Sequence, residues 1–357
     1  MNTNDFAYRL LTWYPDNCRD LPWRKTDDPY IIWLSEIILQ QTKVAQGLPY
    51  FMVFSETFPD VKSLAEAPLS LVMRCWQGLG YYSRARNLHA CAQQVVHDWG
   101  GNFPDSYRDL LKLKGVGPYT AAAIASFAFG EKVAVVDGNV YRVLSRFFGV
   151  DADISTQKGK KEFEKLANQL IATSDPGTYN QAIMEFGALQ CVPKSPDCHS
   201  CPLVENCHAF SANRVQDYPV KTKKVKIKKR YFSYLHITCA GYTVVKERGA
   251  GDIWQGLVDF PLDEFKNEKQ NQWEDGESLA SLRGFSRSQI DVFGTTYKHI
   301  LSHQWIFATF VQVRLQKGDL EILRNWVEDR NYLLVNGEEL EDLGKPILIA
   351  KYLIDCD

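Results

Sequence analysis

The segment LLKLKGVGPYTAAAIASFAF, residues 110–129, decides the fold of the N-terminal part of the chain. It predicts a helix, a tight turn at Gly115-Val116-Gly117, and a second helix with Pro118 in its first turn. Free backbone amides before such a helix form an anion site. A DNA phosphate could bind there, and this contact would not depend on the base sequence of the DNA. A plain turn between helices has the same pattern, so the segment alone leaves both interpretations open.

Helical periodicity extends outward from this segment in both directions. From Asp5 to about residue 190 the sequence predicts helix after helix, with Pro- or Gly-containing breaks at 58–60, 100–106 and 174–177. The run KTKKVKIKKR, residues 221–230, then places seven basic residues in ten positions and marks a change of composition. We therefore expect an all-helical domain that ends before this run.

The length of 357 residues, with 45% apolar residues, is enough for two hydrophobic cores. We expect a helical domain at 1–212, a basic linker at 213–229 and a smaller α+β domain at 230–357.

Within the second domain, the alternation of apolar and polar residues predicts strands in 230–248 and 303–315. The tail at 338–354 predicts a terminal helix, and the polar stretch at 261–290 predicts loops.

The formal net charge of −2 excludes a uniformly basic coat, so any nucleic-acid contact must come from a local positive face. No apolar run approaches the roughly 20 residues that span a bilayer, and the N-terminus lacks the pattern of a secretory leader. We expect a cytoplasmic monomer without membrane contact, associated with the nucleoid if the protein is bacterial.

Four of the nine cysteines are clustered, at Cys191, Cys198, Cys201 and Cys207. In a reducing compartment such a cluster indicates a metal site rather than disulfides. Four thiolates can hold a zinc ion or a [4Fe–4S] cluster, and their spacing by itself does not distinguish the two.

Two acidic residues stand in unusual surroundings. Glu36 lies in the apolar segment PYIIWLSEIILQQT, where burial would raise its pKa and retain a proton. Asp137 lies in VAVVDGNVYRVLSR, where an apolar run stops and a helix begins. Considered alone, Glu36 could equally be a buried structural group, and Asp137 an ordinary helix cap.

The cysteine spacing C-x6-C-x2-C-x5-C, the hairpin at 110–129 and the segments LSEIILQQT and WQGLGYYSRARNL together resemble the helix-hairpin-helix DNA glycosylase superfamily, and within it the adenine glycosylase branch. The resemblance implies a mainly α glycosylase domain with a [4Fe–4S] cluster loop, followed by a smaller α+β Nudix-like domain. The implied partner is double-stranded DNA with adenine opposite 8-oxoguanine or, more slowly, guanine. Contacts with a sliding clamp or other repair proteins stay open.

The resemblance also assigns chemical roles. Glu36 would protonate adenine and then help to activate water, while Asp137 would stabilise the sugar cation with Asn139 beside it. Tyr119 occupies the position where bifunctional relatives have the lysine that forms a Schiff base, so base removal without efficient strand cleavage is expected.

Further residues are expected to contact DNA. By the same resemblance, Tyr81 stacks beside the damaged guanine. The others would enter the duplex, line the base pocket or meet phosphates and acidic partners: Gln40, Gln41, Thr42, Arg84, Arg86, Gly115 and Gly117.

In the second domain, WQGLVDFP at 254–261 resembles a Nudix-fold motif, but no glutamate-rich run follows it to bind magnesium, which excludes a nucleotide hydrolase of that type. Ser302 and His303 correspond to an 8-oxoguanine-reading Phe-Ser-His loop in which Leu301 replaces the phenylalanine.

Two alternatives stay open. A non-catalytic lesion-binding protein would have the cluster and DNA affinity without base release. An endonuclease III-like pyrimidine glycosylase and lyase is opposed by Tyr119, by Glu36 and by the long C-terminal domain.

Overall fold

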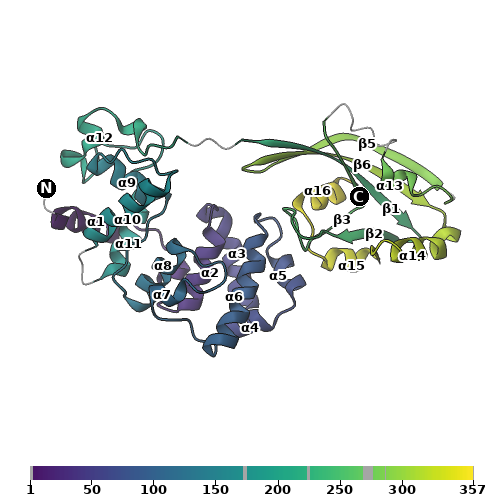
Figure 1. Ribbon diagram of the computed structural model, residues 1–357, viewed down its shortest axis with the longest axis horizontal. Helices are drawn as coiled ribbons and strands as arrows, with labels where there is room; N and C mark the ends of the chain where they lie inside the picture. The colour runs from purple at the N-terminus through teal and green to yellow at the C-terminus, as the bar shows by residue number, and fades with distance from the viewer. Residues whose placement is uncertain (1–2, 172–174, 223–225, 268–275, 286, 357) are drawn as a thin grey trace. The chain divides into compact units, whose positions relative to one another are not determined.

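The computed structural model describes residues 3–171, 175–222, 226–267, 276–285 and 287–356 (Figure 1). They form two compact units, of which one comprises Met1–Glu66 and Asn87–Lys223 and the other Ala67–Arg86 and Lys224–Asp357. Composition gives no sign that a segment from the middle of the helical region groups with the C-terminal residues. Parts of the expected break at 174–177 and of the basic run at 221–230 lie outside the described residues.

The first unit is helical, as the periodicity predicts. Its elements are α1 (Thr3–Asn17), η1 (Pro22–Arg24), α2 (Pro29–Leu39), α3 (Val44–Thr57), α4 (Val61–Glu66), most of α6 (Ser83–Trp99), α7 (Tyr107–Leu110), α8 (Pro118–Phe129), α9 (Gly138–Phe148), α10 (Gln157–Leu170), α11 (Pro176–Leu189), η2 (Val204–Asn206), α12 (His208–Ser211) and η3 (Val215–Asp217). No helix among the described residues is long and apolar enough to cross a membrane.

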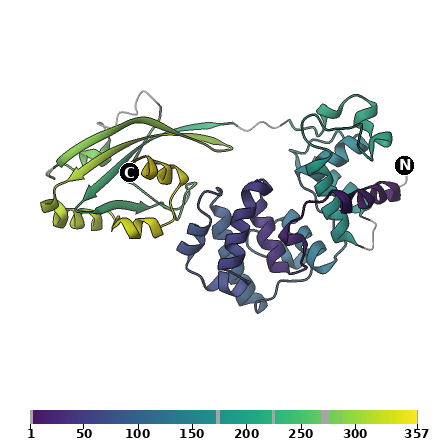
Figure 2. The same ribbon diagram turned by 180° about the vertical axis from the view of Figure 1, so that it is seen from behind.

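Two groups of helices build this unit (Figure 2). Helices α1, α9, α10 and α11 share a core that contains Phe6, Phe147, Phe163 and Phe186, all almost fully buried. Helix α2 packs against α3 and α8, and α8 also contacts α11. Burial of each phenylalanine contributes roughly 1.5–3 kcal/mol to the free energy of unfolding. This core therefore stabilises the arrangement of the helices.

The hairpin at 110–129 has the expected turn and second helix. Gly115 has φ +75°, and a Cβ there would lie 2.8 Å from the Cβ of Asn87, so both backbone conformation and space demand glycine. Pro118 is the first residue of α8. The first helix is shorter than expected, because α7 ends at Leu110 and the chain continues in tight turns such as Leu113 N to Leu110 O.

The second unit contains a seven-stranded mixed sheet. Its elements are α5 (Leu69–Cys75), β1 (Lys228–Cys239), β2 (Tyr242–Glu247), β3 (Val258–Asp259), β4 (Leu262–Phe265), α13 (Glu277–Ala280), β5 (Arg287–Ile300), β6 (Gln304–Leu315), η6 (Lys317–Asp319), α14 (Leu320–Glu328), β7 (Leu333–Val335), α15 (Gly337–Asp342) and α16 (Ile347–Cys356). The strand order is β3-β2-β1-β6-β5, with β4 on β1 and β7 on β2. Strands β1 and β6 are parallel and the other pairs antiparallel. The strands expected in 230–248 and 303–315 are confirmed.

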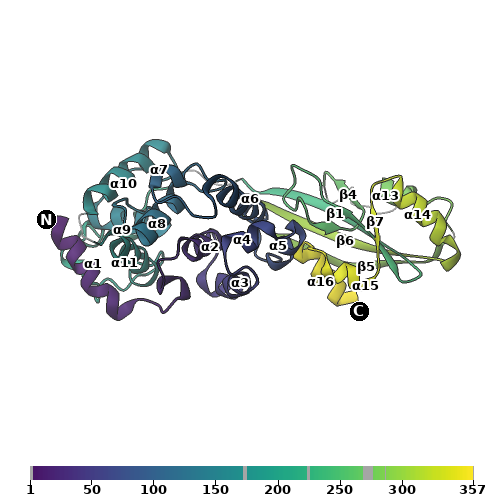
Figure 3. The same cartoon turned by 90° about the horizontal axis from the view of Figure 1, so that it is seen from below.

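Helices cover both faces of this sheet. On one face lies α16 (Figure 3). Its Tyr352 stacks on Phe310 of β6, with ring centroids 3.8 Å apart. On the other face α13 and α14 pack through Leu279, Leu323 and Trp326 onto the later parts of β1 and β6. The earlier parts of these strands lie beyond that packing.

One expectation for this unit is wrong and another is incomplete. The tail at 338–354 forms two helices, α15 and α16, because Pro346 disfavours helical geometry at the residue before it. The stretch at 261–290 contains β4, α13 and the start of β5 rather than loops alone; residues 268–275 and 286 lie outside the described residues. Strand β4 is only four residues long and is defined by its pairing with β1, which local periodicity cannot reveal.

Candidate active site

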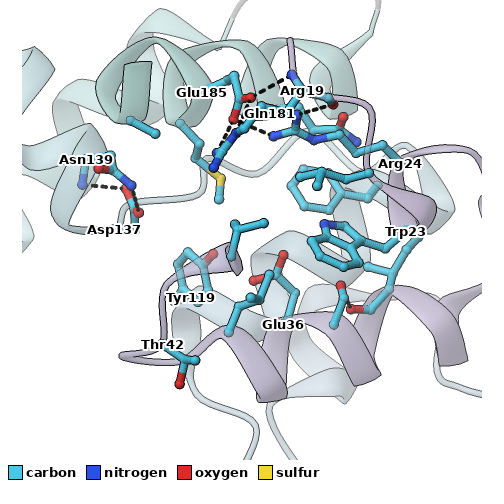
Figure 4. A pocket seen from close by; sticks show the side chains of 18 residues that line it. Arg19, Trp23, Arg24, Glu36, Thr42, Tyr119, Asp137, Asn139, Gln181 and Glu185 are labelled. Carbon is cyan, nitrogen blue, oxygen red and sulfur yellow. Dashed lines mark hydrogen bonds and ion pairs between the residues drawn. The ribbon is translucent and has the colours of Figure 1, made fainter. Parts of the chain in front are cut away.

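One cavity of about 170 Å³ in the helical unit brings all four expected catalytic residues together (Figure 4). Its walls come from α2, α8, α9, α11 and the segment after α1. The polar and aromatic lining residues are Arg19, Trp23, Arg24, Ser35, Glu36, Thr42, Tyr119, Asp137, Asn139, Gln181 and Glu185. Residues more than 160 positions apart thus face one space.

Glu36 is placed by α2. This helix begins at Pro29 because the Asp28 side chain accepts a hydrogen bond from the Tyr30 amide. The Glu36 side chain is only 7% exposed, and burial raises the pKa of its carboxyl to about 7. A hydrogen bond with Tyr119 opposes this shift, and the nearby charge of Asp137 adds to it. Glu36 therefore holds a proton that can be transferred near neutral pH.

Tyr119 is the second residue of α8 and lies beside Glu36 in the cavity (Figure 4). Burial, together with the two acidic neighbours Glu36 and Asp137, raises the pKa of its phenol well above the usual value. The phenol stays protonated, and its hydrogen bond with Glu36 opposes the rise in the pKa of that carboxyl. It provides no amine.

Asp137 is the N-cap of α9 and also lines the cavity, so the cap is confirmed and the catalytic role stays a prediction. One carboxylate oxygen accepts the Asn139 and Val140 amides at 2.8 Å each, and the other accepts the Asn139 side-chain amide at 2.7 Å. Burial raises the pKa of Asp137, while these hydrogen bonds oppose the rise and favour the carboxylate. A fixed carboxylate at a helix N-terminus can face a developing positive charge.

Arg142 connects this carboxylate with the first cysteine of the cluster. Its guanidinium donates to Asn139 Oδ1 at 2.8 Å, to the Gly187 carbonyl at 2.6 Å and to the Cys191 carbonyl at 2.7 Å. One turn later Arg146 donates to Cys191 Sγ at 3.4 Å and to the Val192 carbonyl. Two buried arginines of α9 thus hold the start of the cysteine loop.

An ion cluster that the sequence reasoning missed forms the opposite wall. Glu185 of α11 is 1% exposed and accepts hydrogen bonds from Arg19 at 2.6–2.9 Å and from Arg24 at 2.7 Å. Burial alone would raise its pKa, but the two arginines outweigh burial and lower it to about 2. The signal was present, because Glu185 lies in the apolar segment AIMEFGAL much as Glu36 lies in its own.

The residues that follow α2 differ in their surroundings, because some line the cavity and others do not. Thr42 lines the cavity. Gln40 donates to the Thr120 hydroxyl at 3.2 Å, and the exposed Gln41 has φ +55°. Gln40 and Gln41 are therefore not lining residues of this cavity. The hairpin glycines Gly115 and Gly117 likewise lie apart from its lining.

The four clustered cysteines, all half-buried, line a second cavity of about 30 Å³ together with Arg146. Burial is the main cause that raises the pKa of three of their thiols, that of Cys201 to about 12. Within the described ranges, no three His, Cys, Asp or Glu side chains are grouped as ligands of a single metal ion.

The expected lesion-reading residues meet in the second unit. Tyr81, which has φ +52°, and Ser302 share a hydrogen bond of 2.6 Å between their hydroxyls, and Ser302 lies 3.3 Å from His303 Nδ1. Arg84 lies against the rings of Trp76 and Tyr81, and burial lowers its pKa to about 10.

Arg86 donates to the Gln255 carbonyl at 2.5 Å. Arg84 donates to the Gly80 carbonyl at 3.3 Å. Both acceptors are backbone carbonyl oxygens, and contacts of the two arginines with phosphates or acidic partners stay a prediction.

Residues 34–169 match the family described as HhH-GPD superfamily base excision DNA repair protein. Similar proteins include the adenine DNA glycosylases of Buchnera aphidicola subsp. Baizongia pistaciae, 33% identical over 89% of this chain and 88% of the relative, and of Arabidopsis thaliana, 42% identical over 98% and 64%.

Among solved structures, a thermostable thymine-DNA glycosylase is 31% identical, with a TM-score of 0.55 over 59% of this chain and 97% of that one. An endonuclease III in a non-covalent DNA complex, 24% identical with a TM-score of 0.52 over 60% and 98%, shares the fold.

Proposed function

This chain belongs to the adenine DNA glycosylases of the HhH-GPD superfamily, and we propose that it hydrolyses the N-glycosidic bond of adenine opposite 8-oxoguanine or guanine in double-stranded DNA. The observation that carries the proposal is the cavity where Glu36, protonated near neutral pH and hydrogen-bonded to Tyr119, shares one space with the capped carboxylate of Asp137.

The two carboxyl groups divide the reaction between them. Adenine departs more easily once a ring nitrogen is protonated, and Glu36 is the group in this cavity whose pKa, about 7, suits that transfer. The sugar then carries positive charge, which Asp137 stabilises as a carboxylate. Asn139 fixes Asp137 through two hydrogen bonds, and the deprotonated Glu36 accepts a proton from the attacking water.

The ion cluster is suited to hold the extruded base. A base that leaves the duplex loses its pairing and stacking, so polar groups must replace its hydrogen bonds. Arg19, Arg24, Gln181 and Glu185 offer donors and acceptors along one wall, and Trp23 offers a ring. The mutual ion pairs keep these side chains in place before any base enters.

Base removal in this cavity proceeds without a covalent amine. A lyase needs a lysine whose amine attacks the sugar, whereas Tyr119 stands at this position and its phenol stays protonated. We expect an intact strand with an abasic site as the product.

For the domains we propose a division of labour in which 1–212 cleaves the bond, 213–229 links and 230–357 recognises the opposite base. Ser302 and His303 supply the polar groups, and Tyr81, hydrogen-bonded to Ser302, supplies a ring. Leu301 provides less stacking area than a phenylalanine would.

For the cofactor we propose a [4Fe–4S] cluster held by Cys191, Cys198, Cys201 and Cys207. A zinc ion would draw four sulfurs to about 2.3 Å from one point. Four cysteines line one common cavity, and their C-x6-C-x2-C-x5-C spacing resembles that of the iron–sulfur glycosylases, which favours a polynuclear cluster. When bound, such a cluster would cross-link the loop and couple its order to folding. About four iron atoms and four acid-labile sulfides per chain are expected; stoichiometric zinc would contradict the assignment.

The reaction is tested by mass spectrometry of the base released from duplexes with adenine opposite 8-oxoguanine, guanine or thymine. We expect free adenine from the first two. Tight binding without release from any duplex would favour a lesion-binding protein. Release of an oxidised pyrimidine from other duplexes instead would favour an endonuclease III-like enzyme.

A further inference from the structure

One face of the β5–β6 hairpin carries aromatic and basic side chains that the proposed function leaves unused. The hairpin turn is closed by a hydrogen bond from Leu301 N to Gln304 O, which places Ser302 and His303 at its tip. Strand β1 runs alongside, and Lys228 N donates to His303 O.

The pairing of the strands places these side chains on the same side of the sheet. Trp305 of β6 pairs with Ile300 of β5 and with Lys229 of β1. In the next row on that side, Phe307 pairs with Lys298 and with Tyr231. Directly paired residues point to one face, so the two rows form a continuous strip behind the tip. We call Lys229, Tyr231, Lys298, Trp305 and Phe307 the lysine–aromatic face.

Contacts within this face fix its shape. The rings of Tyr231 and Phe307 are stacked, with centroids 5.3 Å apart and an interplanar angle of 14°. Lys298 Nζ lies 4.4 Å from the Trp305 ring centroid and 5.6 Å from that of Phe307. Such contacts hold an ammonium group in one place without occupying its N–H donors.

The face is open. Lys229 and Lys298 are exposed, the two rings of β6 are half-buried, and Ile300 beside them is 62% exposed. The acids of neighbouring β4 are engaged elsewhere, because Asp263 accepts from Ser278 and Glu264 pairs with Arg230. The strip therefore combines positive charge with apolar area, which suits the phosphates and sugars of a nucleic acid.

We propose that the lysine–aromatic face binds the backbone of the duplex arm next to the base that Ser302 and His303 read, an inference that rests on the proposed function. Charge complementarity and continuity with the hairpin tip both favour DNA as the occupant. Lys298 lies four residues from Ser302 along an extended strand, which is about 13 Å. At 3.4 Å per base pair, the contact lies within about four base pairs of the lesion.

The test measures equilibrium binding to an 8-oxoguanine:adenine duplex over a range of salt concentrations, with Lys229→Met and Lys298→Met combined. Methionine keeps most of the apolar stem and removes the charge. We expect the slope of log K against log salt to decrease in magnitude by about 1.8, since each lost phosphate contact contributes about 0.9. Lys317→Met removes an exposed lysine just beyond the far end of β6 and should leave affinity unchanged.

A second comparison locates the contact. Shortening one arm of the duplex at a time to two base pairs, with the other arm at full length, should abolish the difference between wild type and double variant for one of the two arms, while full-length duplexes preserve it. An unchanged salt slope, an equal loss on both shortened duplexes, or a larger loss on single-stranded than on double-stranded DNA would each overturn the inference. If wild type binds no duplex at all, the proposed function fails as well. Excision at saturating enzyme should be the same in wild type and double variant, which separates this role from catalysis.

Discussion

At the scale of single residues, two buried glutamates of one cavity ionise in opposite ways because their neighbours differ. Glu36 has a phenol as its hydrogen-bonding partner, and burial keeps its pKa near 7. Glu185 has two guanidinium groups as partners, and its pKa falls to about 2. One carboxyl group is thus available as an acid, while the other is a permanent anion that positions cations.

The raised pKa of Glu36 makes stability depend on pH. The folded protein binds more protons than the unfolded chain between the unfolded value of 4.5 and the folded value of about 7. The contribution of protonated Glu36 to the free energy of unfolding is therefore fully present below pH 4.5. This contribution, about 3 kcal/mol, is lost as the pH rises to 7. Denaturant unfolding between pH 5 and pH 8 should show this loss in wild type and not in Glu36→Gln.

Glu66→Gln, at an exposed position of α4, should follow wild type at every pH. Parallel curves for wild type and Glu36→Gln would show that the Glu36 pKa is not raised.

The lowered pKa of Glu185 should make stability depend on pH in the opposite direction. Its stabilising effect is complete above pH 4.5 and is lost as pH falls toward 2. At pH 7, Glu185→Gln should lower the free energy of unfolding by about 3 kcal/mol, because the arginines lose a buried partner. The difference between the variant and wild type should shrink below pH 4.5.

The exposed Glu205, which pairs with Arg9, gives a matched control. Glu205→Gln should change stability by less than about 1 kcal/mol. Equal effects at the two positions would contradict the described cluster.

At the scale of elements, the hairpin between α7 and α8 separates two roles of glycine. Gly115 has φ +75° and no room for a Cβ, so it is needed for folding. Gly117 is the N-cap of α8 with φ −96°, and nothing lies within 4 Å of where its Cβ would be. We therefore expect Gly117 to leave the helix N-terminus open to a phosphate.

Gly115→Ala should therefore destabilise the protein by about 1–3 kcal/mol, measured by denaturant unfolding. Gly117→Ala should fold with nearly unchanged stability and bind duplex DNA more weakly, measured by fluorescence anisotropy. A Gly117→Ala variant with normal affinity would show that no phosphate approaches this turn.

The elements also show which features of the fold and the site could be predicted from the sequence. The helices, the hairpin turn, the place of Glu36 in α2 and the cap position of Asp137 follow from local patterns, since the interactions that decide them span few residues. Arg19 and Arg24 were missed because only their contact with α11 gives them a role. Strand β4 and the Tyr81–Ser302 hydrogen bond join segments far apart in the chain, where periodicity carries no information.

At the scale of the whole molecule, the proposed chemistry and the proposed recognition of the opposite base reside in different segments of the chain. The candidate catalytic cavity is lined by residues of the first unit, whereas Tyr81, Ser302 and His303 belong to the second. Such a separation allows recognition of the opposite base to change without altering the acid and the carboxylate that act on adenine.

A double variant, Ser302→Ala with His303→Ala, tests this separation. Loss of one or two hydrogen bonds to the oxidised guanine should reduce affinity for adenine:8-oxoguanine duplexes about tenfold. Affinity for adenine:guanine duplexes serves as the internal control and should change little. An equal reduction for both pairs would mean that the loop does not distinguish the opposite base.

The most direct test of the central claim is single-turnover cleavage of an end-labelled adenine:8-oxoguanine duplex, scored with and without alkali, for wild type and Glu36→Gln. We predict that wild type gives strand breaks only after alkali treatment, and that Glu36→Gln binds the duplex normally while its rate falls by roughly 10²–10⁴. Breaks without alkali would contradict the assignment of Tyr119 to base removal alone. Full activity of Glu36→Gln would contradict the assignment of Glu36 as the acid.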